Sequence, residues 1–314
     1  MRLRRSTTDV QTGERFSAGR RAGEIALVAL ICGAVGIAFA PIFVRLSEVG
    51  PSATAFYRLL FALPALALWW GWEDRNAGGQ TRATGWADYA GLVLAGLFFA
   101  GDLAFWHWSI RFTSVANATL LANFAPIFVA LAGFVLFGER FSRTFLVGLV
   151  LALTGACVLM GQSVTLSRLH LFGDALGIIT AMFYGAYIVT VGRLRARMST
   201  ATIMTGSGVV TCVVLLPVAM VSGEDLVAVT ASGWAVLVAL ALVSHAGGQS
   251  LIAYALAHLP ATFGSVALLL QPAVAALLAW LILGEALGVW QIAGAVIILA
   301  GIVLARKGSR RDGV

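Results

Sequence analysis

The sequence predicts an all-helical membrane protein in which ten helices cross the bilayer. Of its 314 residues, 60% are hydrophobic and only 11% are charged, whereas an ordinary soluble domain has about 25% charged residues. A helix needs about 20 consecutive apolar residues to cross the hydrocarbon, and the chain contains ten such runs. A set of proline, glycine and glutamate positions also recurs in the second half, which predicts two related halves.

The predicted spans follow one another with short connections, none long enough to hold a soluble catalytic domain. The first run contains Ala38-Phe39-Ala40, which resembles a signal-peptide cleavage site. Because this run is long for a signal peptide and Pro41 follows directly, we interpret it as a retained span. The spans are predicted at residues 25–45, 52–72, 87–110, 114–137, 143–161, 172–192, 201–221, 233–257, 262–283 and 287–305.

Basic residues are distributed unevenly between alternate connections, which predicts the orientation of the spans. One side of the membrane holds 17 of the 21 Lys and Arg residues, whereas the other holds Arg45, Arg111 and Arg168. Because Lys and Arg accumulate on the cytoplasmic side, we expect both termini there, as basic tails at 1–22 and 306–314. Attraction to anionic lipid explains the net charge of +7 without a nucleic-acid partner.

The two halves share residues at an offset of 146. Each half holds five spans, an odd number, so the second must enter the membrane in the opposite orientation. The inverted repeats are predicted at 23–161 and 171–305, a pattern typical of transporters, whose substrate site lies near the midplane between the halves. Paired glycines seven residues apart permit close helix packing. The matches are Pro126 with Pro272, Gly138 with Gly284, Glu139 with Glu285, Gly148 with Gly294, and Gly155 with Gly301.

A proline within span 4 and another within span 9 predict helix kinks. Pro126 and Pro272 each remove a backbone hydrogen bond, which is tolerated in a membrane only where protein or cavity water satisfies the freed carbonyl. The kinks should therefore face the interior, either as fixed bends that shape a cavity or as moving hinges. Glu139 and Glu285 precede the next spans, and we interpret both as caps of the following helix N-termini.

Polar residues of several spans are predicted at a similar depth. A rise of 1.5 Å per residue places Asp102 of span 3 roughly 13 Å, and Arg58 of span 2 roughly 10 Å, below the outer boundary. Asn123, His245 and Gln271 of spans 4, 8 and 9 fall near the same level. Because polar side chains rarely face lipid, we expect this layer to line a wet cavity.

Asp102 has two interpretations that the sequence leaves open. It forms a structural ion pair with Arg58, or it belongs to a functional site for a substrate or a proton. His107 lies nearer the outer boundary and is interpreted first as a satisfied interfacial histidine and second as a ligand. Arg111, at the boundary itself, is expected to extend toward water.

Further candidates lie near this layer. His245 and Gln249 are four residues apart and are expected to face the same way. Trp106, four residues after Asp102, belongs to an interfacial aromatic belt or to a cavity wall. Tyr184 and Tyr187 line the cavity or pack with their hydroxyls satisfied.

Three segments resemble a known family. TSVANATLLANFAPIFVALAGFVLFGERF (113–141) and LPATFGSVALLLQPAVAALLAWLILGEAL (259–287) are similar to the paired EamA domains of the drug/metabolite transporter superfamily, and GPSATAFYRLLFA (50–62) fits as well. The resemblance implies ten helices in two inverted five-helix repeats. It also implies an inner-membrane carrier, because many members export amino acids, other metabolites, nucleotide sugars or xenobiotics.

We therefore expect a carrier that works by alternating access and exports small metabolites or amino-acid-like solutes. No metal or cofactor is expected, and no ATP, because nucleotide-binding and catalytic motifs are absent from the sequence. Proton coupling stays open; Asp102 is its best candidate, since a moving Arg58 would change how readily that carboxyl holds a proton. The expected partners are a small solute and the bilayer, and a homodimer stays open. The alternatives are an importer of a vitamin or nucleotide-like metabolite, a membrane receptor, and an intramembrane enzyme.

Overall fold

The computed structural model of the chain describes residues 7–76, 83–113, 115–161 and 168–309. Every element within these residues is a helix, and ten helical segments are long and apolar enough to cross a membrane. This confirms the predicted fold class and the number of spans. Of the two predicted tails, residues 1–6 and 310–314 lie outside the described residues, while α1 begins at Thr7 and α15 ends at Ser309.

Half of the spans are continuous helices and half are interrupted. Spans 3, 5, 6, 7 and 10 are α5 (Trp86–Phe112), α8 (Arg143–Met160), α9 (Arg168–Leu194), α10 (Thr200–Val221) and α15 (Val289–Ser309). The interrupted spans are α1 (Thr7–Ala38) with α2 (Ala40–Leu46), α3 (Pro51–Leu60) with α4 (Ala62–Asn76), α6 (Val115–Ala122) with α7 (Ala125–Phe137), α11 (Ala231–Ala239) with the π-helix η2 (Leu240–Gln249) and α12 (Ser250–Ala255), and α13 (Ala261–Ala267) with α14 (Leu270–Leu283).

Proline explains four of these five interruptions. Pro41, Pro64, Pro126 and Pro272 each lie within the first three residues of the helix that follows a break. Proline fits there because the first turn of a helix leaves its N–H groups unpaired in any case. The breaks associated with Pro126 and Pro272 fall just before the prolines, at residues 123–124 and 268–269. Span 8 has no proline at its irregular segment, which is a π-helix continuous with α11 and α12.

The Gly-Glu pairs that follow spans 4 and 9 end a helix. Gly138 and Gly284 have φ angles of 66° and 69°, a left-handed conformation that favours glycine. The backbone N–H of Glu139 donates to Gly133 O at 3.0 Å, and that of Glu285 donates to Ala279 O at 3.3 Å. These are the hydrogen bonds of a Schellman-type C-terminus.

The expectation that Glu139 and Glu285 cap the following helices is therefore wrong. Ser142 caps α8 instead, by accepting a hydrogen bond from the backbone N–H of Phe145 at 3.2 Å. The Gln291 side chain accepts from the backbone N–H of Gly288 at 2.8 Å, before α15. The Glu285 carboxylate forms an exposed ion pair with Arg45, at 2.5 Å. Both glutamates lie four residues before the first residue of the next helix.

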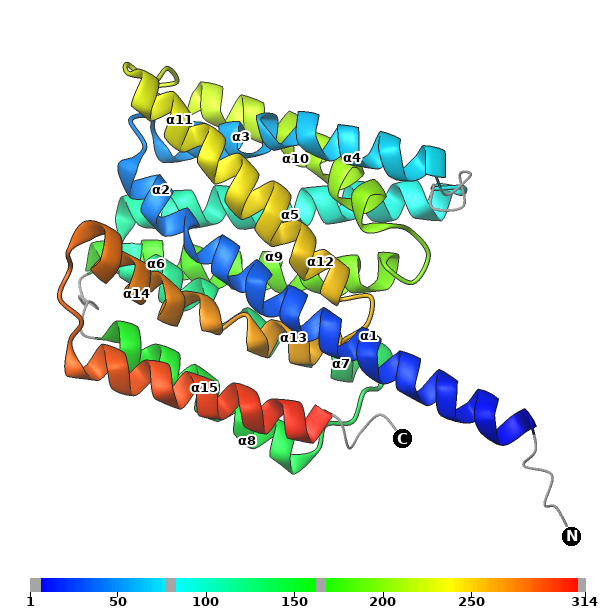
Figure 1. Ribbon diagram of the computed structural model, residues 1–314. Helices are drawn as coiled ribbons and strands as arrows, with labels where there is room; N and C mark the ends of the chain where they lie inside the picture. The colour runs from blue at the N-terminus through cyan, green and yellow to red at the C-terminus, as the bar shows by residue number, and fades with distance from the viewer. Residues whose placement is uncertain (1–6, 77–82, 114, 162–167, 310–314) are drawn as a thin grey trace, which may run out of the picture.

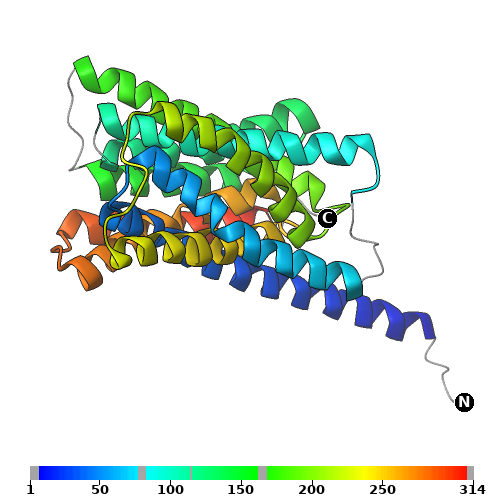
Figure 2. The same cartoon turned by 90° about the horizontal axis from the view of Figure 1, so that it is seen from above.

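The two halves exchange contacts across the bundle. α1 packs against η2, α12 and α14 of the second half, whereas α9, the first span of the second half, packs against α5, α6 and α7 of the first. α8 and α15, the last spans of the two halves, pack side by side at one edge (Figure 1). The N-terminal part of α1 projects beyond the other helices, as two perpendicular views show (Figures 1 and 2).

Two carboxylates tie together the connections at the end of the bundle opposite the termini. Glu48 accepts hydrogen bonds from the backbone N–H groups of Val229 and Thr230, each at 2.9 Å, and from the Thr230 hydroxyl. These hydrogen bonds, led by that of the Thr230 hydroxyl, lower the pKa of Glu48 below its usual value. Conversely, Glu224 of the second half accepts a hydrogen bond from the backbone N–H of Ser52 in the first half, at 2.7 Å. Each carboxylate thus lies at the first turn of a helix in the other half.

Arg111 takes part in the same set of contacts. Its guanidinium lies 3.5 Å from the Glu224 carboxylate and 3.4 Å from the Ser222 carbonyl. The sequence predicts a side chain that only extends toward water, and the structure adds a specific carboxylate partner. That partner follows α10 by sequence, and it reaches Arg111 because α10 packs along α5.

A first prediction concerns the contact between α8 and α15. A Cβ atom at Gly155 would lie 2.6 Å from the backbone nitrogen of Ile298 and 2.8 Å from the carbonyl oxygen of Gly294. Because backbone atoms cannot move aside cheaply, Gly155→Ala should lower the free energy of unfolding by about 1–3 kcal/mol. Thermal unfolding of the purified protein in detergent would measure the change.

The matched control is Gly71→Ala in α4, where a Cβ would meet no heavy atom within 4 Å. Alanine favours a helix by up to about 1 kcal/mol over glycine, so this variant should melt at or above the temperature of the unchanged protein. If both variants melted at the same temperature, close packing of α8 on α15 would not contribute to stability.

Candidate functional site

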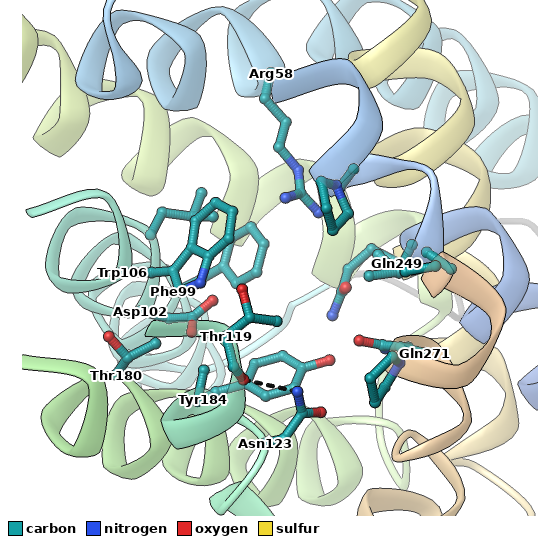
Figure 3. Close-up of a pocket in the computed structure, with 18 residues that line it drawn as sticks. Arg58, Phe99, Asp102, Trp106, Thr119, Asn123, Thr180, Tyr184, Gln249 and Gln271 are labelled. Carbon is teal, nitrogen blue, oxygen red and sulfur yellow. Dashed lines mark hydrogen bonds between the residues drawn. The ribbon is translucent and has the colours of Figure 1, made fainter. Parts of the chain in front are cut away.

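A cavity of about 130 Å³ lies between the two halves and contains most of the predicted polar residues. Seven of the ten spans contribute to its wall, and only spans 5, 7 and 10 do not. Figure 3 shows the polar side chains pointing into this space from several helices. The polar and aromatic residues in the wall are Arg58, Phe99, Asp102, Trp106, Thr119, Asn123, Thr180, Tyr184, Gln249 and Gln271.

Irregular parts of the helices converge on this cavity. The α1–α2 junction contributes Pro41, the α6–α7 break contributes Asn123, and the first turn of α14 contributes Pro272. Gln249, also in the wall, is the last residue of the π-helix η2. Interrupted backbone in a membrane needs protein or cavity water to satisfy its freed polar groups. The cavity therefore lies where the sequence breaks its helices.

Arg58 and Asp102 share the cavity without forming an ion pair. They are the only charged side chains in the described wall, and no nitrogen of Arg58 lies within 4.0 Å of an Asp102 oxygen. Figure 3 shows them on separate walls, with the guanidinium entering from α3 and the carboxylate from α5. Among the described residues, no hydrogen bond reaches the Asp102 carboxylate either. The permanent ion pair that the sequence left open is therefore not formed in this conformation.

Aromatic rings support the buried Arg58. Its side chain is 7% exposed, its Nε atom has no hydrogen-bond partner among the described residues, and its guanidinium lies 5.9 Å from the centre of the Phe99 ring. Phe99 in turn packs against Tyr187 at 4.7 Å between ring centres. The ring offers a cation–π contact that helps to hold a guanidinium away from water.

Amide groups and a phenol form another part of the wall. Asn123 donates from its side-chain nitrogen to the Thr119 carbonyl at 2.7 Å (dashed line in Figure 3). The Tyr184 hydroxyl points toward the amides of Gln249 and Gln271 (Figure 3). The amide nitrogen of Gln271 is buried without a hydrogen-bond partner in the described chain. Since buried polar atoms are normally hydrogen-bonded, this wall is suited to bind polar groups of a solute.

Three predicted site residues lie outside the cavity wall. Tyr187 is 1% exposed, and its hydroxyl approaches the Met204 sulfur at 3.7 Å. His107 is buried within the bundle, and its Nδ1 atom lies 2.6 Å from the Leu103 carbonyl. His245 is buried with its ring against Phe99, at 5.3 Å between ring centres.

His245 and Gln249 do not both line the cavity, although their spacing of four predicts a common face. That prediction assumes an α-helix, whereas both residues belong to the π-helix η2. A π-helix has hydrogen bonds from i to i+5, and its winding alone still leaves residues four apart near one face. Gln249 reaches the cavity, and His245 packs behind it.

The two kink prolines also differ in position. Pro272 is part of the cavity wall, whereas Pro126 is buried beside it and is absent from the described wall. Sequence reasoning missed Phe99, Thr119 and Thr180. Each lies three or four residues before a residue that was identified, on the same helix face, and this spacing is the signal that would have found them.

A second cavity of about 390 Å³ adjoins the first. The two cavities share Pro41, Thr119, Pro272 and Ala275 in their walls. The second is also lined by Arg45 and Glu285, which are about half exposed. The second cavity therefore extends from the site toward the end of the bundle opposite the termini, where Arg45 and Glu285 lie. Among the described residues, no cluster of three or more His, Cys, Asp or Glu side chains could hold a metal ion.

Comparison with known proteins agrees with this architecture. The sequence profile of the EamA-like transporter family matches residues 24–161 and again 171–306. A threonine/homoserine exporter, RhtA of Salmonella typhimurium, is 29% identical over 82% of this chain and 81% of its own. The pseudopaline exporter CntI of Pseudomonas aeruginosa is 28% identical over 68% of this chain and 74% of its own.

Two further likenesses extend the comparison. A protein of Archaeoglobus fulgidus, named only as an uncharacterized transporter, is 28% identical over 84% of this chain and 91% of its own. One solved crystal structure superimposes with a TM-score of 0.76 at 18% identity, covering 94% of this chain and 99% of that chain. At that identity, the superposition supports the fold alone.

The path to the cavity can be tested by thiol labelling. In a chain whose Cys32, Cys157 and Cys212 are replaced by serine, Ala275→Cys should react quickly with a hydrophilic thiol reagent, because Ala275 lines both cavities and is partly exposed. Ser265→Cys should react slowly, because Ser265 is 1% exposed in α13. Mass spectrometry would measure the labelling rates in the purified protein, and equal rates would contradict the described path.

Proposed function

Because the chain belongs to the EamA-like transporter family of the drug/metabolite transporter superfamily, we propose that it exports small metabolites or amino-acid-like solutes by alternating access. The multi-pass membrane location and the transporter class follow from the family and from the ten spans. The solute, the direction and the driving force are proposed here. The inner-membrane location and the cytoplasmic position of both termini are proposed as well.

The observation that carries this proposal is the polar cavity between the halves. It is lined by residues of both repeats, with Arg58 and Asp102 contributed by the first and Tyr184, Gln249 and Gln271 by the second. A binding site between two inverted repeats can face either side of the membrane when one repeat rocks against the other. No nucleotide-binding motif occurs in the sequence, so an ion gradient, exchange or facilitated diffusion is left to drive the movement.

The proposed orientation gives the conformation a direction. With both termini in the cytoplasm, the second cavity leads from the site to the outside, past Arg45 and Glu285. In this conformation, an exporter would release its solute to the outside, whereas an importer would take up its solute from there. Release by an exporter is supported by the relatives that are named as exporters of threonine and homoserine and of pseudopaline.

A second candidate function is import of a vitamin or nucleotide-like metabolite. It is favoured by the aromatic side chains of Trp106 and Tyr184, which both belong to the cavity wall. Planar rings of a solute could stack on either side chain. Saturable uptake of such solutes into proteoliposomes, with no movement of amino acids, would favour import over the first candidate.

Proton coupling through Asp102 is the most specific part of the proposal. In proteoliposomes with an imposed pH gradient, the unchanged protein should drive a solute against its concentration gradient. Asp102→Asn keeps the size of the side chain and cannot gain or lose a proton. It should reduce the gradient-driven flux roughly tenfold or more, within the range seen when a proton-transferring group is removed.

The flux is measured at saturating solute, so that weaker binding does not account for the loss. Asp225→Asn is the matched control, because Asp225 is an exposed residue outside the cavity. Exchange of labelled for unlabelled solute, which needs no net proton movement, verifies that the variant is folded and mobile. A folded Asp102→Asn protein that retains full pH-driven flux would exclude Asp102 as the coupling group.

A further inference from the structure

The two opposite charges in the cavity determine which charged groups a solute needs in order to bind between them. Arg58 and Asp102 are contributed by different helices, α3 and α5, and they are not paired with one another. An unpaired charge in a membrane-spanning bundle is costly, and such charges usually have a partner. A solute that carries both charges could satisfy both residues at once.

From this arrangement, and resting on the proposed transport function, we propose that the cavity binds α-amino acids in one orientation, with the carboxylate toward Arg58 and the ammonium toward Asp102. The names of the relatives give the solutes of those proteins and no binding residues. In this chain, Arg58 and Asp102 are assigned to the two charged ends of the solute.

Arg58 has the properties of a carboxylate-binding group. A guanidinium is planar, keeps its charge and donates several parallel hydrogen bonds, which match the two oxygens of a carboxylate. The Arg58 side chain is held by burial and by Phe99, and its Nε donor has no partner in the described chain. Its guanidinium points into the cavity in Figure 3.

Asp102 has the properties of an ammonium-binding group. Its carboxylate accepts no hydrogen bond from the described residues and belongs to the wall of the cavity. Trp106, one helical turn further along α5, contributes its ring to the same wall (Figure 3). A carboxylate beside an aromatic ring attracts a cation both directly and through the ring face.

The balance of charge favours a zwitterion over a simple anion or cation. With no other charged side chain in the described wall, an ionised Arg58 and an ionised Asp102 sum to zero. A zwitterion keeps this sum, whereas an acid or an amine alone would leave one residue unpaired. The amides of Asn123, Gln249 and Gln271 remain available for a polar side chain of the solute.

Binding measurements on the purified full-length protein in detergent can test the two ends separately. The standard amino acids are screened first by thermal shift, which reports binding to the folded form. The best binder is then compared with its deaminated acid and its decarboxylated amine; for threonine, these are 3-hydroxybutyrate and 1-amino-2-propanol. The amino acid should bind roughly tenfold or more tightly than either, as expected for a hydrogen bond to a charged group.

The two variants should have opposite selectivity. Asp102→Asn should weaken binding of the amino acid and the amine roughly tenfold or more and leave the acid unchanged. Arg58→Gln should weaken the amino acid and the acid and leave the amine unchanged. Arg58→Lys, which retains the charge, should recover part of the acid binding and guards against a folding defect in Arg58→Gln.

Asp225→Asn and Arg143→Gln are the matched controls, since both residues are exposed and outside the cavity. The inference is overturned if no standard amino acid binds the unchanged protein. It is also overturned if the acid or the amine binds as tightly as the amino acid, or if both variants weaken all three ligands equally. Selective binding without flux in proteoliposomes would contradict the proposed transport function and leave this inference standing.

Discussion

The constraint on which this structure depends is that lipid cannot hydrogen-bond to a polypeptide backbone. Four of the ten spans are nevertheless broken near a proline, and a fifth contains a π-helix. A broken helix leaves carbonyl and N–H groups without partners. Such groups are tolerated only where protein or a wet cavity surrounds them. The junction of α1 with α2, the break before α7 and the first turn of α14 all contribute to one cavity. The positions of the prolines therefore determine where a polar site can exist in this bundle.

The inverted repeat then determines what surrounds that site. α1 packs on spans of the second half and α9 packs on spans of the first, so each half completes the wall of the other. The glycine contacts between α8 and α15 hold the last spans together at the edge of the bundle, away from the cavity. In the proposed alternating access, one half would rotate against the other about this packed edge without breaking the helices. In this sense, the repeated Gly-x6-Gly pattern and the repeated proline have different roles, the first in packing and the second in shaping the site.

Much of this was predictable from the sequence, because the number of spans depends on hydrophobic run length and the repeat depends on residue offset. The similar depth of the polar residues was predictable as well. The structure places four of them in the wall of one cavity, namely Arg58, Asp102, Asn123 and Gln271. The direction of each side chain around its helix was not predictable from depth. Tyr187, His107 and His245 are buried outside the described wall although they lie close to its level. The absence of an ion pair between Arg58 and Asp102 depends on the distance between helices, which sequence spacing does not contain.

Proton coupling and amino-acid recognition meet at Asp102 if both proposals hold. A single carboxylate cannot bind an ammonium group and carry a proton on the same oxygens, so solute and proton would compete for it. Release of an amino acid to the outside would leave Asp102 facing the unpaired charge of Arg58, and its protonation would depend on how closely Arg58 approaches. A carboxyl that returns with a proton and leaves with an ammonium group exchanges one for the other in each cycle. That exchange would drive export with an inward proton gradient, and it requires that Arg58 and Asp102 remain apart when the cavity faces the outside. In the conformation described here they are not paired.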